Sequence, residues 1–319
     1  ATVDMGAVEV QKYPKVYIVG NTGDSGDGSL RQAILDNNGG GGGGAIIFTI
    51  GSGGQTISLQ SPLPPITQPL IIDGSTQPNI TPGTPGIGLT GPSLVTINAD
   101  NVTLQGLSIT RFGGNGVAVN GSHVTLSGVT ISRNGGSGVA IGGSHITLTG
   151  SAITNNGSGG GASCSGVTVA SGASNVTISQ NVITGNTCSG ILSSGTNVQI
   201  IGNTISGNGG DGVQVGSGGS ANAILNNSIK DNTGAGINLA AGANNSQQSP
   251  ALTFAALTGL TASQGAGNSS AVQGTVSGTA ATTYRVQVFA NQTCDASGAG
   301  EGATFLGETQ ITLDPNGAR

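Results

Sequence analysis

A repeat of 22 to 25 residues, with one longer unit, runs through the middle of the chain from Asn101 to Asn245. The units open with a triplet in which apolar and polar residues alternate, and an isoleucine follows at fixed spacing. An asparagine comes three residues later in five of the six units, with Phe112 in the first, and a Gly-Val or Gly-Ile pair follows at a fixed distance except after Asn156. A strand this short cannot bury its inner face alone, whereas stacked copies bury a continuous core. The repeat therefore predicts a solenoid. The units begin at Val102, Val124, Ile146, Val176, Val198 and Ala223.

Each unit holds three short alternations separated by turns rich in Gly, Asn and Ser, which indicates three strands per coil. Helical solenoids need longer units and good helix formers, and these units have neither. The predicted fold is all-β: a three-faced parallel β-helix with coils of about 22 residues, stacked about 4.8 Å apart.

The composition agrees with stacking. The chain has 61 Gly, and only 7% of its residues are charged. Turns between faces favour Gly and Asn because these residues tolerate positive φ. A charge repeated in every coil would stack like charges, and residues 134–210 contain no Asp, Glu, Lys or Arg. We therefore expect the repeated asparagines to form an internal hydrogen-bonded ladder. This ladder comprises Asn134, Asn156, Asn186, Asn208 and Asn232.

The two ends of the chain break the period. Residues 29–38 form the one good helix pattern, with Ser29 as N-cap, and we expect this helix to cap the first coil. Residues 1–20 form an N-terminal strand segment, and residues 21–250 form the β-helix. Residues 251–319 alternate over longer strands and predict a small antiparallel β-sandwich that lacks its last strand.

The run from Asn21 to Ile34, NTGDSGDGSLRQAI, resembles the opening of units in large bacterial right-handed parallel β-helix repeat surface proteins. The run Pro62–Ile66 followed by Ile72-Asp73-Gly74 resembles the same family, and residues 294–307 resemble the small β module that follows its helix. The resemblance implies a right-handed pectate-lyase-like superfold and a secreted or cell-surface location. It implies no catalytic residues.

Two pairs of side chains fall in equivalent positions of neighbouring coils. Cys164 and Cys188 both lie two residues before the repeat glycine, so stacking predicts a disulfide between them, and Cys294 is left over. His123 and His145 also share a register. Other coils place asparagine there, so we interpret the histidines as turn residues and predict no metal site and no cofactor.

Enzymes on this superfold need clustered carboxylates or a basic residue beside them. Asp211, Lys230 and Asp231 are the nearest candidates, but their registers keep the two carboxylates roughly 13 Å apart. Arg111 and Arg133 share a register and predict either solvated surface or an anion-binding pair. We therefore assign no catalytic residue, although an enzymatic activity stays open.

A column of threonines lies between the inward-facing residues of successive triplets, and it breaks at Gln199 and Ile224. Regular threonine arrays on flat solenoids order water, so ice binding is a third, weaker hypothesis; good strand formation explains the same column. The column comprises Thr103, Thr125, Thr147 and Thr177.

These observations favour a non-enzymatic structural and adhesive module of a secreted or cell-surface protein, assembling into an array or filament through its terminal strands. The alternative is a carbohydrate-binding or polysaccharide-degrading β-helix, with its site on the loop 157–165 or near Asp211. The chain has no basic surface for nucleic acid and no apolar run long enough to enter a membrane. Strand 3–10 of one chain completing the sandwich of the next is the route that we expect for self-association.

Overall fold

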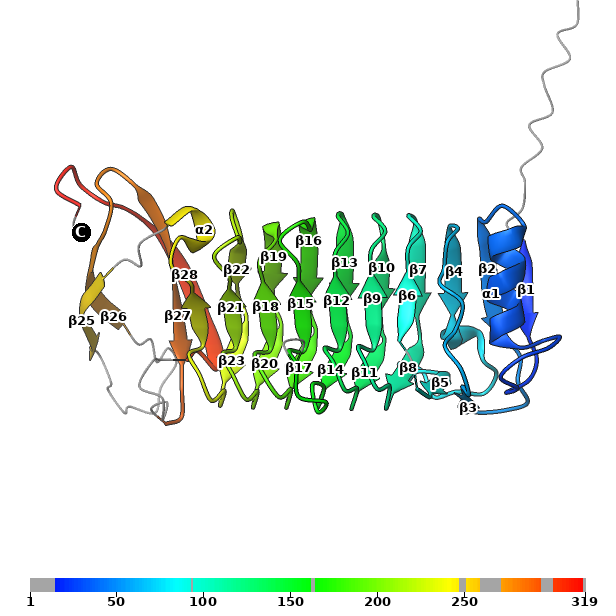
Figure 1. Cartoon of the computed structure of the whole chain (residues 1–319). Helices are drawn as coiled ribbons and strands as arrows, with labels where there is room; N and C mark the ends of the chain where they lie inside the picture. Colours follow the sequence, from blue (N-terminus) through cyan, green and yellow to red (C-terminus); the bar gives the residue numbers. More distant parts are fainter. Residues whose placement is uncertain are drawn as a thin grey trace, which may run out of the picture.

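The computed structural model describes residues 15–92, 94–161, 164–246, 251–258, 271–293 and 301–317. The strands from β1 to β24 form a rod of stacked coils with three parallel sheets along its length, here called sheets A, B and C (Figure 1). Within each sheet every strand pairs in register with the equivalent strand of the neighbouring coil, on both sides except at the two ends. The predicted three-faced parallel β-helix is confirmed.

Sheet A has nine strands: β1 Val16–Val19, β2 Gly44–Phe48, β4 Leu70–Asp73, β7 Val102–Gln105, β10 Thr125–Ser127, β13 Ile146–Thr149, β16 Ser174–Ser179, β19 Thr196–Ile201 and β22 Ala223–Leu225. Sheet B has eight: β3 Gln55–Ser58, β5 Ile87–Thr90, β8 Leu107–Thr110, β11 Thr130–Ser132, β14 Ala152–Thr154, β17 Val182–Thr184, β20 Thr204–Ser206 and β23 Ser228–Lys230. Sheet C has seven: β6 Val95–Ile97, β9 Val117–Val119, β12 Val139–Ile141, β15 Val167–Val169, β18 Ile191–Ser193, β21 Val213–Val215 and β24 Ile237–Leu239.

The core lies inside the coils, where every second strand residue points inward. Leu104, Leu126 and Leu148 stack in adjacent coils of sheet A, and each is fully buried. Ile109, Ile131 and Ile153 do the same in sheet B. The residues between them face outward, so each sheet offers a flat, regular outer face.

The helix α1, Leu30–Gly39, covers the first coil (Figure 1). Ser29 is its N-cap and accepts a hydrogen bond from the Gln32 N–H, while Leu30 and Ile34 are buried against the coil. Strand β1 pairs with β2 and is the first strand of sheet A. The strand at 3–10, on which the self-association hypothesis depends, lies outside the described residues.

An ion pair fixes this cap to the rod. The Arg31 guanidinium donates to the Asp24 carboxylate at 2.8 Å and to the Ser61 carbonyl at 2.8 Å. The hydrogen bond from Arg31 lowers the pKa of Asp24, although partial desolvation opposes the shift. The pairing links the two parts of the motif at residues 21–34: Arg31 on the helix and Asp24 in the turn before it.

The repeated asparagines form a continuous buried ladder. The amide of each asparagine donates to the side-chain oxygen of the next at 2.8–3.0 Å and also to a backbone carbonyl of the preceding coil. The ladder runs through Asn134, Asn156, Asn186, Asn208 and Asn232, all of them buried.

A second buried ladder lies at the turn between sheets A and B. Asn181 donates to Asn203 at 3.0 Å, and Asn203 donates to Asn227 at 2.9 Å. Sequence reasoning missed it. The signal was present, because each of these asparagines lies two residues before the repeat isoleucine. The second ladder covers fewer coils, since in the coil before Asn181 the equivalent residue is Ser151. The Ser151 hydroxyl accepts a hydrogen bond from Val129 N–H, and Ser151 N–H donates to Asn181 Oδ1.

The sixth unit differs from the sequence alignment by one residue. Gln199 pairs with Ala223, so the residue equivalent to Val198 is Asn222 and not Ala223. Asn222 points inward and accepts a hydrogen bond from the Val198 N–H at 2.9 Å. After Gln199, where the threonine column breaks, the next outward residue in register is therefore Ala223 rather than Ile224. The polar Asn222 therefore stands where the preceding coils have an apolar residue, and its backbone N–H donates to Asn244 Oδ1 at 2.6 Å.

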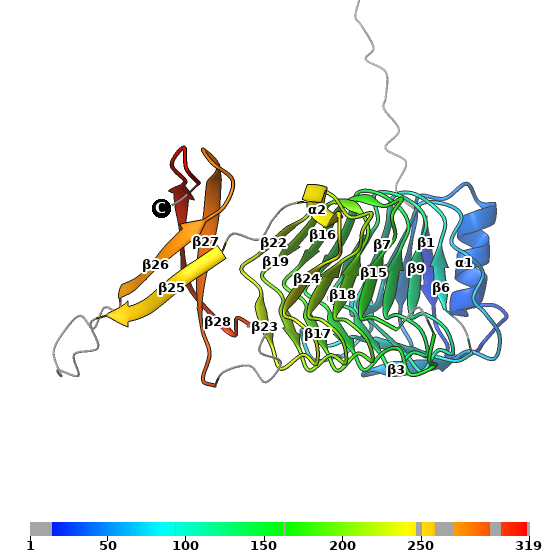
Figure 2. The ribbon, with the colours of Figure 1, turned by 60° about the vertical axis from the view of Figure 1, so that its left-hand side comes forward.

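After the short helix α2, Ala243–Ser246, two antiparallel hairpins follow the last coil (Figure 2). The first pairs β25, Ala251–Thr258, with β26, Ala271–Ser277, and the second pairs β27, Thr283–Ala290, with β28, Thr304–Thr312. The loop before β28 touches the rod. There Glu301, 8% exposed, accepts from Asn232 Nδ2 at 2.8 Å, and Gly302 O accepts from Ile229 N–H at 2.8 Å.

Glu301 therefore occupies the place of the next ladder asparagine. A carboxylate accepts hydrogen bonds and donates none when ionised, so it satisfies the last asparagine and needs no further coil. The segment at Glu301 and Gly302 caps the C-terminal end of the coils, as α1 caps the other end.

Candidate functional site

The outer face of sheet B carries an unbroken column of hydroxyl groups. Seven serines and threonines lie in register in seven adjacent strands, so at strand spacing the column is roughly 29 Å long. None of these seven hydroxyl groups makes a hydrogen bond to another residue in the described part of the chain. Six of the seven residues are half-buried. The column comprises Ser58, Thr90, Thr110, Ser132, Thr154, Thr184 and Ser206.

Arg111 and Arg133 directly follow two members of this column, at the corner where sheet B ends. Their strands pair in register, and Arg111 N–H donates to the Ser132 carbonyl at 3.3 Å, so the two arginines lie in adjacent coils. Both are exposed. The ion pairs found among the described residues involve other basic side chains, namely Arg31, Lys230 and Arg285.

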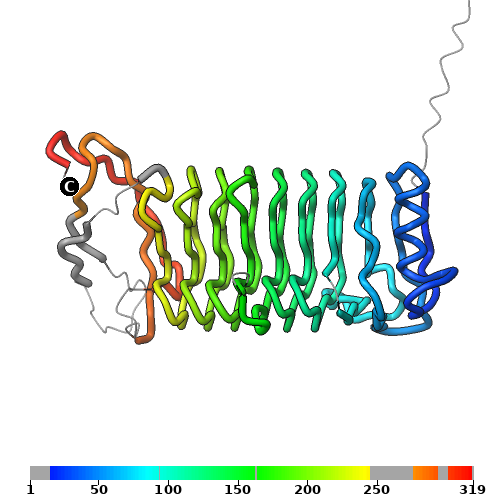
Figure 3. The backbone as a smooth tube through the Cα atoms, in the orientation of Figure 1, coloured from blue at the N-terminus to red at the C-terminus, as the bar shows by residue number. Residues whose placement is uncertain are grey.

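The inserted loop, residues 157–165, leaves the rod at the same corner. Gly159 N–H donates to the Gly135 carbonyl at 2.8 Å, and Gly135 lies two residues after Arg133. Its residues 157–161 are drawn in green at the lower edge of the rod (Figure 3). The structure thus brings together the hydroxyl column, the arginine pair and the loop. Of these three features, the carbohydrate-binding hypothesis drawn from the sequence had named only the loop.

Cys164 and Cys188 form a disulfide in the structure, with their Cα atoms 5.2 Å apart. The bond joins the end of the inserted loop to the next coil. Cys294 lies outside the described residues.

We expect the Cys164→Ser/Cys188→Ser double variant to lose roughly 3 kcal/mol of unfolding free energy, because the disulfide closes a loop with a sequence separation of 24 residues. Denaturant unfolding with and without a reductant measures the loss. The reductant should shift the midpoint of the wild type and leave that of the double variant unchanged. Equal midpoints for the wild type in both conditions would contradict the prediction.

The histidine pair lies at a different corner, before sheet A. The rings of His123 and His145 stack with centroids 4.7 Å apart and an interplanar angle of 5°, and Asn175 Nδ2 lies 3.5 Å from His145 Nε2. Parallel stacked rings do not direct their nitrogen lone pairs at one point between them. Among the described residues there is also no group of three or more His, Cys, Asp or Glu side chains that would hold a metal ion.

The acidic candidates near the last coils do not converge on one point. Asp211 accepts from Ala235 N–H at 2.8 Å and from Asn238 Nδ2 at 2.9 Å, which makes it a turn residue. Lys230 and Asp231 form an exposed ion pair with 3.6 Å between their charged atoms. Neither arrangement places two carboxylates across a bond to be broken.

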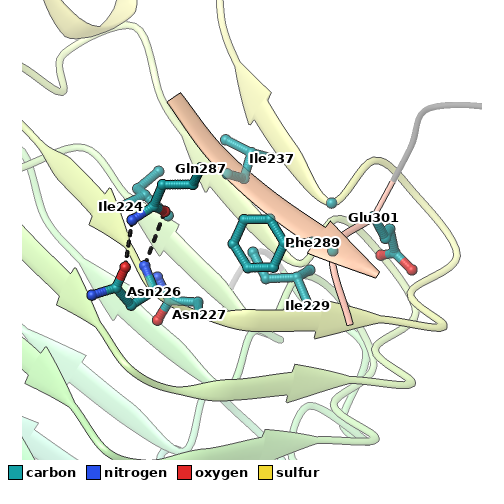
Figure 4. Close-up of a pocket in the computed structure, with 10 residues that line it drawn as sticks. Ile224, Asn226, Asn227, Ile229, Ile237, Gln287, Phe289 and Glu301 are labelled. Carbon is teal, nitrogen blue, oxygen red and sulfur yellow. Dashed lines mark hydrogen bonds between the residues drawn. The ribbon is translucent and has the colours of Figure 1, made fainter. Parts of the chain in front are cut away.

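A cavity of about 570 Å³ lies between the last coil and the second hairpin (Figure 4). Ile229 and Phe289 supply apolar wall. Gln287 bridges the gap by a pair of hydrogen bonds with Asn226, one of them 3.1 Å long from Asn226 N–H to Gln287 Oε1. Since its polar groups hold the hairpin on the rod, we interpret this cavity as part of the cap.

Sheet A presents the predicted threonine column on its outer face. The column Thr103, Thr125, Thr147 and Thr177 is half-buried and in register. On the N-terminal side it gives way to the exposed side chains of Ile71 and Val16. Sheet A therefore offers a shorter hydroxyl array than sheet B. Ice binding by this face stays a prediction.

The family comparison agrees with this architecture. The sequence matches the family described as "Right handed beta helix region" over residues 92–249 and 161–272, which together span more than half of the chain. The chain belongs to the right-handed beta helix family. The match begins shortly before β6, Val95–Ile97, and extends past β24, Ile237–Leu239, so it covers the coils that carry both asparagine ladders.

Solved structures with the same fold share little sequence with this right-handed beta helix protein. Pectate lyase Pel9A is 18% identical, with 73% of this chain and 72% of that chain covered and a TM-score of 0.43. The mannuronan C-5 epimerase AlgE4 A-module of Azotobacter vinelandii is 17% identical, with coverage of 60% and 62% and a TM-score of 0.41. The Dettilon tailspike protein gp208 is 20% identical, with coverage of 64% and 46% and a TM-score of 0.36.

These likenesses concern the fold alone. No protein with a curated description matches the sequence of this right-handed beta helix protein. In the described part of the chain, no helix has the length and apolar character needed to cross a membrane.

Proposed function

We propose that this chain is an adhesive rod that binds a polysaccharide along the outer face of sheet B. The hydroxyl column from Ser58 to Ser206 supports the proposal. Hydroxyl groups donate and accept hydrogen bonds, as the hydroxyls of a sugar do. The column runs parallel to the rod axis, and its spacing from coil to coil is comparable with the length of one sugar residue in an extended polysaccharide.

The rigidity of the face favours binding of this kind. The ladders and the in-register strands hold each hydroxyl in place before the ligand arrives, so little side-chain ordering opposes association. The inserted loop borders one side of the face, and the disulfide ties that loop to the rod. A disulfide is also typical of an extracellular protein, so we place the protein outside the cell or on its surface.

The proposal does not include catalysis, because Asp211, Lys230 and Asp231 serve turns and ion pairs on the surface. It keeps the adhesive role expected from the sequence and takes the polysaccharide from the alternative hypothesis. Assembly into arrays or filaments remains a separate prediction.

The Thr110→Val/Thr154→Val/Thr184→Val variant removes three hydroxyls from the column without changing the size of the side chains. We expect its affinity for the bound polysaccharide to fall roughly a hundredfold, since each of the three lost hydrogen bonds contributes about 1 kcal/mol. Affinity gel electrophoresis against a panel of acidic and neutral polysaccharides measures the binding. Reducing or unsaturated ends are followed in the same samples, and any turnover there would contradict the non-catalytic assignment.

The matched control is Thr103→Val/Thr125→Val/Thr147→Val on sheet A, which makes the same chemical change on another outward column. This control should bind as the wild type does. Equal losses in both variants, or a wild type that binds no polysaccharide in the panel, would refute binding on sheet B.

A further inference from the structure

Arg111 and Arg133 occupy a backbone position that does not suit arginine. Their φ angles are +61° and +56°, in the left-handed region. Asn and Asp populate this region readily and Gly does so without steric cost, whereas a long side chain there is uncommon. The other coils follow that rule. The equivalent residues are Asn155, Gly185, Gly207 and Asp231, all with positive φ.

The same two residues also place like charges side by side. Adjacent parallel strands lie about 4.8 Å apart, and like charges directly opposite one another are destabilising. Every residue from 101 to 210 other than these two arginines lacks a formal charge at pH 7, when histidine is counted as neutral. The ion pairs among the described residues also include neither arginine.

We propose that Arg111 and Arg133 form an anion-binding subsite, which recognises the carboxylate or sulfate groups of an acidic polysaccharide. Backbone strain held at exposed residues is typical of functional positions. Guanidinium groups bind carboxylate and sulfate oxygens through paired, charge-assisted hydrogen bonds. An anion between the two side chains would relieve their mutual repulsion. The next residue of the corner column, Asn155, is exposed and carries a side-chain amide, a group that can donate a hydrogen bond to an anion.

This subsite deepens the proposed function and rests on it, because it lies at the border of the hydroxyl column. The ligand would follow the column and place an acidic group at the corner. The chain as a whole carries a formal charge of −5, so its other surfaces repel an anionic polymer. The arginine pair would therefore fix where along the rod such a polymer binds.

The test uses the Arg111→Asn/Arg133→Asn variant, which gives both coils the residue that Asn155 already provides. Binding of polygalacturonate and of neutral dextran is measured by affinity gel electrophoresis, and thermal unfolding is followed in sodium chloride and in sodium sulfate at equal ionic strength. In chloride the variant should unfold at a higher temperature than the wild type, because it loses both the strained arginines and their repulsion. Arg285→Gln, which removes an exposed arginine of the second hairpin, is the matched control.

We expect the variant to bind polygalacturonate at least tenfold more weakly, because it loses one or two charge-assisted hydrogen bonds to the ligand. Sulfate should raise the unfolding temperature of the wild type by roughly 2 °C more than it raises that of the variant. Comparing the two proteins removes the general stabilising effect of sulfate, which both share. The Arg285→Gln protein should behave as the wild type in both measurements.

Unchanged polygalacturonate binding together with an unchanged sulfate response in the double variant would overturn the subsite and leave polysaccharide binding on sheet B intact. Conversely, an arginine-dependent sulfate response in a wild type that binds no polysaccharide would support the anion subsite and refute the proposed function. Binding of dextran alone, with no arginine-dependent response to sulfate, would refute the subsite.

Discussion

An Asn186→Ala variant is expected to lose about 4 kcal/mol of unfolding free energy. Asn186 is 1% exposed, and its side chain makes four hydrogen bonds within the ladder. Alanine would leave Asn156 N–H and the Ile153 carbonyl without their partners in the core. Each buried group left unsatisfied costs about 1–3 kcal/mol, and the loss of the side chain adds a small cavity.

Denaturant unfolding followed by circular dichroism measures this loss. Asn238→Ala is the matched control, because Asn238 is exposed on β24 and its amide donates only to the Asp211 carboxylate. The control should change the unfolding free energy by less than about 1 kcal/mol. A similar small change for Asn186→Ala would show that water satisfies the ladder groups, and the ladder would then contribute little to the stability of the rod.

The first ladder was predictable because its asparagine recurs at a fixed place in the repeat, and a polar residue at a fixed inward place must be hydrogen-bonded. The second ladder has the same physical basis, yet it covers fewer coils. Asn181, Asn203 and Asn227 each lie two residues before the repeat isoleucine, but the serine at position 151 occupies this place in the preceding coil and ends the pattern there. A search for asparagines two residues before each isoleucine finds them.

The C-terminal cap was beyond sequence reasoning for a different reason. Glu301 and Asn232 are 69 residues apart in the chain, and no repeat relates them. Only the three-dimensional course of the second hairpin brings the carboxylate over the end of the ladder. The repeat predicts contacts between coils, whereas a cap is a single long-range contact and leaves no periodic signal.

The arginine pair shows what periodicity does and does not predict. Sequence reasoning placed Arg111 and Arg133 in one register, which the strand pairing supports. It did not predict their left-handed backbone conformation, because arginine, unlike glycine, is not typical of positions with positive φ. The asparagine and glycines at the same corner in later coils carried that signal, and reading the whole column rather than the pair recovers it.

The repeat glycines need a different explanation from the one expected. Positive φ was the predicted reason for glycine, but Gly138, Gly166 and Gly190 have ordinary φ angles. Their coils approach so closely that a side chain has no room. A Cβ at Gly166 would lie 2.7 Å from the Gly190 carbonyl oxygen of the next coil, and 2.7 Å from Ile183 Cγ2 and Asn186 Nδ2.

We therefore expect Gly166→Ala to destabilise the protein by about 3 kcal/mol or more, the upper range for an overpacked core. The Gly190 oxygen belongs to the backbone and cannot rotate away, so the added methyl group must separate two coils. That separation also stretches the ladder at Asn186. Thermal and denaturant unfolding measure the effect.

Gly172→Ala is the matched control for this change. A Cβ at Gly172 meets no atom within 4 Å, and its φ is ordinary, so alanine there should be neutral or stabilise the protein by about 0.5 kcal/mol through the unfolded chain. A glycine required only for flexibility would give the same small effect at both positions. A large loss at Gly166 alone would show that the glycine column sets the distance between coils, and with it the spacing of the hydroxyl column on sheet B.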